Sequence, residues 1–306
     1  IASSFHMGRG DEKAADQAAV NAMRDFLNEL DVNGKVVIGE GERDKAPMLY
    51  IGETIGKGEV KVDIALDPLE GTTITAQGGE NALSVLAIGE EGSFLHAPDI
   101  YMKKIAYGYK YENLEINIDD EPRKIIKEFS NFSKIREENI VVCILDRPRH
   151  EELIKQVRST GARIKLIPDG DVSAVIATSI DDSGIDIYMG VGGSPEGVLA
   201  AAALRCLGGK IYTKLIYEDD KSFERAKKMG VNDRNQVFKT NDLAKGDVMF
   251  SATGVTDGTL LKGVRINKDD AYTHSVVMRS ETSTIRYINA KHNLNIKKYK
   301  SYFKYP

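Results

Sequence analysis

Five carboxylates stand at positions where this chain could hold a divalent cation. The stretch ALDPLEGTT, residues 65–73, ends an apolar run with Asp67 and Glu70, side chains that are costly to remove from water unless they are paired. A simple turn is one explanation, because Asp-Pro and Gly are common turn residues. A bound cation is the other. Acids in similar positions recur along the chain, and the full set is Asp16, Glu40, Asp67, Glu70 and Glu196.

The placement of these acids favours a shared site. Glu40, Asp67, Glu70 and Glu196 each follow a predicted strand, and ligands of open α/β sheets bind outside the carboxyl ends of strands. Asp16 lies near the start of a predicted helix, where a helix N-cap is the simpler interpretation. Each of the other four, taken alone, could be a solvated loop residue.

The residue types select the kind of cation. The five histidines are scattered and there is no H-x-x-x-H or C-x-x-C pair, which disfavours zinc, whereas oxygen ligands suit Mg²⁺ or Mn²⁺. In DPLEGTT, Pro68 biases Asp67 toward an extended backbone, Gly71 permits a tight turn, and Thr72 opens the next segment. If that segment is helical, its free N–H groups and the Thr72 hydroxyl form an anion pocket beside the carboxylates. Phosphate-ester hydrolysis needs this combination.

The elements that must position these residues begin with a helix. Val20, Met23, Leu27 and Leu30 recur at helical spacing, and Gly34 is predicted to end the helix. Further strands are predicted at the start of segments 35–44 and 60–73, as a hairpin turned at GEEG within 81–98, and within 99–109.

From about residue 122 the pattern changes to a regular alternation. After a helix at 121–133, strands at 139–145, 163–167, 185–192 and 210–216 alternate with helices at 150–161, 171–180 and 194–209. Such alternation predicts βαβ units, with helices covering a largely parallel sheet. Segments 247–255 and 274–290 return to strand patterns. We therefore expect an α/β fold with two lobes, residues 1–120 and 121–306, in which the final strands can return to the first lobe.

Composition excludes several classes of protein. The 306 residues are 42% hydrophobic and 29% charged, as in globular proteins with a sizeable core, and no apolar run approaches the roughly 20 residues that span a bilayer. A net charge of −4 does not suggest a nucleic-acid partner, and the basic segment 297–306 is interpreted as a solvated tail. Cys143 and Cys206 lie in apolar segments, which predicts reduced core thiols and a cytoplasmic location. The start at Ile1 is interpreted as the cut end of a longer polypeptide and not as a signal peptide.

The motif DPLEGTT resembles the D-P-[IL]-[DE]-G-T-[ST] signature of the lithium-sensitive, metal-dependent phosphatases, which include inositol monophosphatase and the fructose-1,6-bisphosphatases. Further blocks resemble the bacterial class II (GlpX-type) fructose-1,6-bisphosphatases, in order: GRGDEKAAD, VVIGEGERDKAPMLYIGE, HAPDIYM, RPRH, IPDGDV, GGSPEGV and FSATGVTDG. The resemblance covers nearly all of residues 8–286. It implies a layered α/β/α/β/α sugar-phosphatase-type fold with mixed and largely parallel sheets. It also implies hydrolysis of fructose 1,6-bisphosphate to fructose 6-phosphate and phosphate, a step of gluconeogenesis.

The resemblance also implies roles for single residues. The family's metal ligands match the five carboxylates Asp16, Glu40, Asp67, Glu70 and Glu196, together with the main-chain carbonyl of Leu69. The catalytic group is Asp67, Glu70 and Thr72, the last matching a threonine that helps to activate the nucleophile. Substrate-binding positions match Thr72, Tyr101, Arg147, Arg149, Asp169 and Asp171. The chain departs from the family at Glu12, where a lysine is frequent and Lys13 follows, and at Arg147, where many relatives carry lysine.

Taken alone, several of these blocks have simpler interpretations. GEGERD could be an acidic surface loop, RPRH a turn with solvated arginines, PDGDV a turn followed by a helix cap, and Tyr101 an ordinary strand aromatic. The occurrence of all these blocks in the order found in the family favours the functional interpretation. We expect a Mg²⁺- or Mn²⁺-dependent sugar-bisphosphate phosphatase that is a homo-oligomer, dimer or tetramer, with neither a membrane nor a nucleic-acid partner. The alternatives are action on sedoheptulose 1,7-bisphosphate or an inositol phosphate, and a catalytically inactive sugar-phosphate sensor.

Overall fold

A computed structural model describes residues 1–41 and 48–295 of the chain. The acids Glu42 and Asp44 of the predicted acidic loop, and the predicted solvated tail, lie outside the described residues. The chain forms two compact units, one made of Ile1–Phe94 and Gly246–Pro306 and the other of Leu95–Lys245. The sequence patterns suggested a division near residue 120. The chain leaves the first unit at Phe94 instead, because the strand that follows pairs within the second unit.

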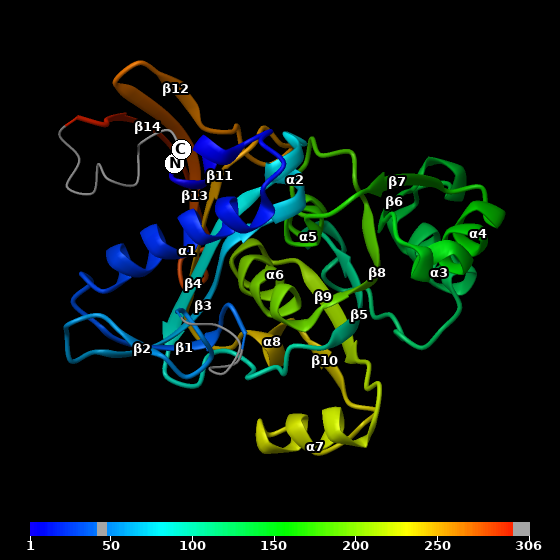
Figure 1. The fold of residues 1–306 in the computed structure, drawn as a ribbon. Helices are drawn as coiled ribbons and strands as arrows, with labels where there is room; N and C mark the ends of the chain where they lie inside the picture. Colours follow the sequence, from blue (N-terminus) through cyan, green and yellow to red (C-terminus); the bar gives the residue numbers. More distant parts are fainter. Residues whose placement is uncertain (42–47, 296–306) are drawn as a thin grey trace. The chain divides into compact units, whose positions relative to one another are not determined.

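The first unit is built on one eight-stranded sheet, of order β12-β13-β11-β4-β3-β1-β2 with β14 paired to β13 (Figure 1). Strands β1 and β3 run parallel, whereas β4 pairs antiparallel with both β3 and β11. Its helices are η1 (Ser3–His6), α1 (Glu12–Leu27) and α2 (Thr72–Gln77). Its strands are β1 (Asn33–Ile38), β2 (Thr54–Ile55), β3 (Lys61–Glu70), β4 (Leu83–Glu90), β11 (Val248–Gly254), β12 (Arg265–Asn267), β13 (Asp270–Arg279) and β14 (Thr284–Asn293).

Helix α1 packs on this sheet through part of the predicted apolar stripe. Val20 and Leu27 are buried in one cluster with Val36 and residues of β3, which confirms the helical periodicity. The helix ends at Leu27, so Leu30 lies beyond it and is exposed. The prediction for Gly34 is wrong, because Gly34 lies in β1, where a Cβ would collide with the Ile64 side chain.

The predicted hairpin within 81–98 does not form. The turn is present, since the Ser93 N–H donates to the Glu90 carbonyl at 3.0 Å, and the Asp63 carboxylate accepts from the Gly92 N–H at 2.8 Å. Both edges of β4 are occupied by strands distant in sequence, β3 and β11, so the residues after the turn have no free edge to pair with.

The second unit contains a six-stranded sheet of order β10-β9-β5-β8-β6-β7, with α3 and α4 on one face and α5 and α6 on the other (Figure 1). Its helices are η2 (Tyr109–Tyr111), α3 (Pro122–Ser133), η3 (Glu137–Asn139), η4 (Pro148–His150), α4 (Glu151–Ser159), α5 (Asp171–Ala177), α6 (Ser194–Leu207), α7 (Asp220–Lys228) and α8 (Thr240–Leu243). Its strands are β5 (Tyr101–Tyr107), β6 (Val141–Leu145), β7 (Arg163–Ile167), β8 (Ile187–Gly193), β9 (Lys210–Leu215) and β10 (Val237–Lys239).

The mixed α/β fold is confirmed, and so is the alternation of strands and helices from residue 122 onward. Only the run β7–β6–β8 is parallel, however. Strand β5 lies antiparallel between β8 and β9 and separates them. Because β5 precedes the alternating segment in sequence, the local pattern carries no sign of this insertion. Within the described chain, none of the helices combines the length and apolarity needed to cross a membrane.

Candidate metal and phosphate site

Parallel pairing of β1 with β3 brings the first acids of the set together. Ile38 lies opposite Ala65, and Glu40 and Asp67 each lie two residues further along their chains. Burial, followed by repulsion from Asp67 and then from Asp16, raises the pKa of Glu40 to about 8. Burial likewise raises the pKa of Asp16. Carboxylates from α1, from the end of β1 and from β3 therefore lie within electrostatic reach of one another.

Asp67 and Glu70 lie in the last residues of β3. The register between β3 and β4 shifts between these two residues, and one carboxylate oxygen of Asp67 lies within 4.8 Å of one of Glu70. Glu70 is only 6% exposed, and a carboxylate so far from water needs compensation for its charge. Asp67 accepts a hydrogen bond from the Leu69 N–H at 2.9 Å, which fixes the backbone between the two acids. Leu69 is itself buried.

Asp16 lies inside α1 and does not cap it. The N-cap is Asp11, whose carboxylate accepts a hydrogen bond from the Ala14 N–H at 2.9 Å, so the capping interpretation of Asp16 is wrong. The neighbouring Ala15 is buried in a cluster with Leu69, and its small side chain allows α1 to approach the end of β3 closely. Glu12 and Lys13 are both exposed in the first turn of the same helix.

Thr72 begins α2, as the predicted anion pocket requires. Gly71 precedes it with φ 92° and ψ 55°, a left-handed conformation that glycine adopts without steric cost. The turn is held by the Thr75 hydroxyl, which donates to the Gly71 carbonyl at 3.1 Å, and by the Gly8 N–H, which donates to the Thr75 carbonyl at 2.9 Å. Thr72 therefore occupies the first helical position, two residues after Glu70, with its side chain half-buried.

The donors in this part of the first unit fit a hard divalent cation. They are carboxylate oxygens from Asp16, Glu40, Asp67 and Glu70, which Mg²⁺ and Mn²⁺ prefer. Burial is the largest cause of the raised pKa of Glu40, and the repulsion from Asp67 and Asp16 that adds to it is of the kind that a bound cation relieves. The assignment of individual ligands remains a prediction.

The second unit holds the other residues of the predicted set. Arg149 lies over the ring of Tyr101, with its guanidinium carbon 4.8 Å from the ring centroid, and its Nε donates to the Val191 carbonyl at 3.0 Å. Arg147 has a different partner, since its Nη2 lies 3.7 Å from an oxygen of Asp169 in a half-exposed ion pair. The two arginines of RPRH are therefore positioned by different parts of this unit.

Asp171 lies in a buried polar network at the start of α5. Its Oδ2 accepts from the Lys104 ammonium at 2.7 Å and from the Tyr188 hydroxyl at 3.2 Å, and both the aspartate and the lysine are almost fully buried. Burial, with the nearby Asp171 charge, raises the pKa of Tyr188, so the phenol keeps its proton and donates. One carboxylate oxygen of Asp171 is thus engaged in these two structural hydrogen bonds. A sugar hydroxyl would have to use the other.

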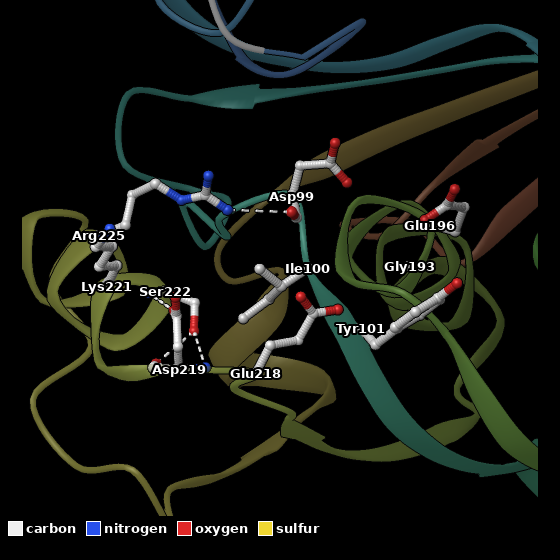
Figure 2. A pocket seen from close by; sticks show the side chains of 10 residues that line it. All are labelled: Asp99, Ile100, Tyr101, Gly193, Glu196, Glu218, Asp219, Lys221, Ser222 and Arg225. Atoms are coloured by element: carbon white, nitrogen blue, oxygen red, sulfur yellow. Dashed lines mark hydrogen bonds between the residues drawn. The ribbon is translucent and has the colours of Figure 1, made fainter. Parts of the chain in front are cut away.

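Glu196 lies in the first turn of α6, directly after the end of β8. Gly193 precedes the helix, and a Cβ there would collide with the Glu196 carboxylate. A cavity of about 580 Å³ opens beside Tyr101, Gly193 and Glu196, with its other wall formed by the start of α7 (Figure 2). This volume lies in the range of small-molecule sites.

Three residues of the second unit were missed by sequence reasoning: Lys104, Tyr188 and His150. His150 is 1% exposed, and burial lowers its pKa. A signal existed for Lys104, because it alternates with Met102 and Ala106 on one face of an apolar strand. The signal for His150 was its place in RPRH, directly beside Arg149.

Comparison with known proteins identifies the family. Residues 1–292 match the family described as bacterial fructose-1,6-bisphosphatase, glpX-encoded. Three similar proteins are named D-fructose 1,6-bisphosphatase class 2/sedoheptulose 1,7-bisphosphatase. Those of Synechococcus sp. (strain JA-2-3B'a(2-13)) and Synechocystis sp. are each 42% identical, over 95% of this chain and 91% and 92% of their own. That of Trichodesmium erythraeum (strain IMS101) is 41% identical over 95% of this chain and 92% of its own.

Three findings agree on the family. The family match covers nearly the whole chain, the relatives are more than 40% identical, and carboxylates cluster at the end of β3. This chain belongs to the glpX-encoded family of bacterial fructose-1,6-bisphosphatases.

Proposed function

We propose that the protein removes the 1-phosphate of fructose 1,6-bisphosphate by hydrolysis that depends on Mn²⁺ or Mg²⁺. Membership of the family makes it a phosphoric monoester hydrolase. The observation that supports the metal dependence is the gathering of Glu40, Asp67 and Asp16: burial of Glu40, and then the charges of Asp67 and Asp16, raise the pKa of Glu40 to about 8.

The cations would be held by the family's set of carboxylates. In the first unit these are Asp16, Glu40, Asp67 and Glu70, with the carbonyl of Leu69. Glu196 of the second unit is proposed as a further ligand on the strength of its motif, GGSPEGV. When bound, the cations supply positive charge to the phosphoryl group and to the leaving oxygen, and they make water more acidic.

The side chains of the chain itself then orient the reacting groups. The Thr72 hydroxyl is proposed to orient the attacking water and pass on its proton, from a position fixed by Gly71 directly after Glu70. The first amides of α2 lack partners within the helix and can donate to phosphate oxygens. The left-handed Gly71 sets the backbone from which both groups extend, which limits the reorganisation that the reaction would need.

The second unit is proposed to bind the rest of the substrate. Arg149, which lies over Tyr101 and is bonded to Val191, would hold the distal 6-phosphate by charge-assisted hydrogen bonds. Arg147 would add a second positive charge to this phosphate, while Asp169 and Asp171 would accept hydrogen bonds from sugar hydroxyls.

A phosphate-release assay with Mn²⁺ tests this function directly. Fructose 1,6-bisphosphate should yield one equivalent of phosphate and fructose 6-phosphate. Sedoheptulose 1,7-bisphosphate is a second candidate substrate, because the relatives' names include it. An inositol phosphate should be a poor substrate, since it does not match the spacing of the two ester groups. Tight binding of the sugar bisphosphate without phosphate release would instead identify a sensor, which has no need of Thr72.

We further propose a homo-oligomer, a dimer or a tetramer, in a reducing compartment such as the cytoplasm. Cys143 and Cys206 are buried and form no disulfide, which supports the compartment. Exposed Ile285, Tyr287 and Ile288 on β14 support association through that strand. Light scattering of the purified protein measures the oligomeric state, and a monomer at micromolar concentration would contradict this proposal.

A further inference from the structure

Strands β6 and β8 separate toward their carboxyl ends. They pair in parallel only at Val142 with Ile187 and at Cys143 with Tyr188, although β8 continues to Gly193. The chain leaves β6 through α4 toward β7, and leaves β8 through α6 toward β9, on opposite sides of the gap and over opposite faces of the sheet (Figure 1). The gap between the two strands is thus the topological switch point, the place where open α/β sheets bind ligands.

The imidazole of His150 bridges this gap. Its Nδ1 lies 2.8 Å from the carbonyl oxygen of Leu145, the last residue of β6, and its Nε2 lies 2.7 Å from the amide nitrogen of Val191 in β8. A backbone N–H can only donate, so Nε2 must accept and Nδ1 must carry the proton. The side chain therefore acts as a neutral imidazole of defined tautomer and replaces the ladder hydrogen bonds that the separated strands lack.

Val191 is also the residue that anchors Arg149. The Arg149 Nε donates to the Val191 carbonyl at 3.0 Å, while His150 accepts from the Val191 N–H. Two neighbours in sequence thus hold the two polar groups of one residue. The bond to Val191 involves Nε and not the Nη groups. The direction of the Nη groups is therefore set by the plane of the guanidinium and by its stacking on Tyr101.

The bond to Val191 matters because the Arg149 side chain has space to adopt a second orientation. A second cavity, of about 260 Å³, is lined by Arg149, His150, Val191 and Asp120. An arginine that loses its bond to Val191 could turn into this space, toward the Asp120 carboxylate, which the Lys124 ammonium contacts at 2.7 Å, and away from a phosphate at the switch point. A long side chain with several rotatable bonds reaches such alternatives at little cost.

We propose that His150 is a positioning residue that holds Arg149, through Val191, in the orientation that binds the distal phosphate of the substrate. The proposal rests on the function proposed above for Arg149. It assigns to the histidine of RPRH a role in substrate affinity and none in bond cleavage.

Two substitutions of His150 test its hydrogen bonds to Leu145 and to Val191 separately. In His150→Asn the side-chain amide can still donate to Leu145 but is too short to accept from Val191. In His150→Gln the longer side chain can place an oxygen near the former Nε2 position. We expect His150→Asn to lower kcat/KM for fructose 1,6-bisphosphate by about 10- to 100-fold, mainly through KM. His150→Gln should recover to within about fivefold of the unmodified enzyme, and p-nitrophenyl phosphate, which has one phosphate, should show less than threefold change in either variant.

A double-variant cycle tests whether the effect passes through Arg149. Adding His150→Asn to Arg149→Ala should cause no further loss on the bisphosphate, whereas independent roles give losses that multiply. Nitrogen-15 NMR of the unmodified enzyme reports the tautomer even if a variant fails to fold. A protonated imidazole, or a proton on Nε2, overturns the proposal.

The remaining outcomes are distinguishable. If the unmodified enzyme releases no phosphate from the bisphosphate with Mn²⁺, the proposed function fails first. If it does and His150→Asn matches it, the positioning role alone is wrong. Equal losses on both substrates, with no recovery in His150→Gln, would mean that His150 only supports the fold.

Discussion

Replacing Glu40 by glutamine should stabilise the metal-free protein in a way that depends on pH. Burial and the charges of Asp67 and Asp16 raise the pKa of Glu40 from 4.5 to about 8. The folded protein therefore binds this proton more tightly than the unfolded chain. As pH rises from 4.5 to 8, the unfolded chain gives up the proton first, so the metal-free protein loses stability over this window.

The size of the effect follows from the two pKa values. Each tenfold change in proton affinity corresponds to about 1.4 kcal/mol, so a rise from 4.5 to about 8 sets an upper limit of about 5 kcal/mol above pH 8. Relaxation of the site and entry of water reduce this value, and we expect about 2–3 kcal/mol. Glu40→Gln keeps the shape of the side chain and removes the charge. The free energy of unfolding of this variant should exceed that of the unmodified protein only slightly at pH 5 and by about 2–3 kcal/mol at pH 8.

Urea denaturation of EDTA-treated protein at pH 5, 6, 7 and 8 measures this difference. Glu59→Gln, at an exposed position of the same unit, is the matched control and should follow the unmodified protein at every pH. Saturating Mn²⁺ should reverse the order, because the metal-bound protein needs the charge of Glu40. A gain for Glu40→Gln that is equal at pH 5 and pH 8 would refute the electrostatic explanation.

Three further predictions concern activity. Asp67→Asn and Glu70→Gln should each lower kcat by at least about 100-fold in the phosphate-release assay while circular dichroism shows a folded protein; a kcat within about threefold of the unmodified enzyme, under about 0.7 kcal/mol on the transition-state scale, would contradict the metal assignment. Thr72→Ser should keep measurable turnover and Thr72→Ala should lose about 100-fold or more, whereas equal losses would mean that the threonine matters for packing. Arg149→Ala should lower kcat/KM for fructose 1,6-bisphosphate by about 30- to 1000-fold and hardly affect p-nitrophenyl phosphate. Parallel losses would place Arg149 at the reacting phosphate and reverse the orientation of the substrate.

The carboxylates of the first unit could be proposed from sequence because each follows directly from a local pattern. Glu40 and Asp67 stand two residues beyond strand positions that pair in parallel, so recognising the two strands was enough to bring them together. Asp16 was recognised from its place near the start of a predicted helix, although the capping interpretation was wrong because Asp11 takes that role.

The parts that could not be predicted depend on pairing between distant segments. Strand β5 was recognised, but its insertion between β8 and β9 is set by partners about 85 and 110 residues away. The roles of Lys104 and His150 have the same origin. The sequence marks both positions, but each residue becomes a bridging group only after folding brings Asp171 or Val191 to it.

The dependence of turnover on a divalent cation tests the proposed chemistry most directly. After treatment with EDTA and desalting, the enzyme should release no phosphate from fructose 1,6-bisphosphate, because the clustered carboxylates cannot neutralise the phosphoryl group without a cation. Mn²⁺ or Mg²⁺ should restore turnover, and Zn²⁺ should do so poorly, since the predicted ligands are hard oxygen donors. Full turnover in metal-free buffer would contradict metal-assisted hydrolysis at the end of β3.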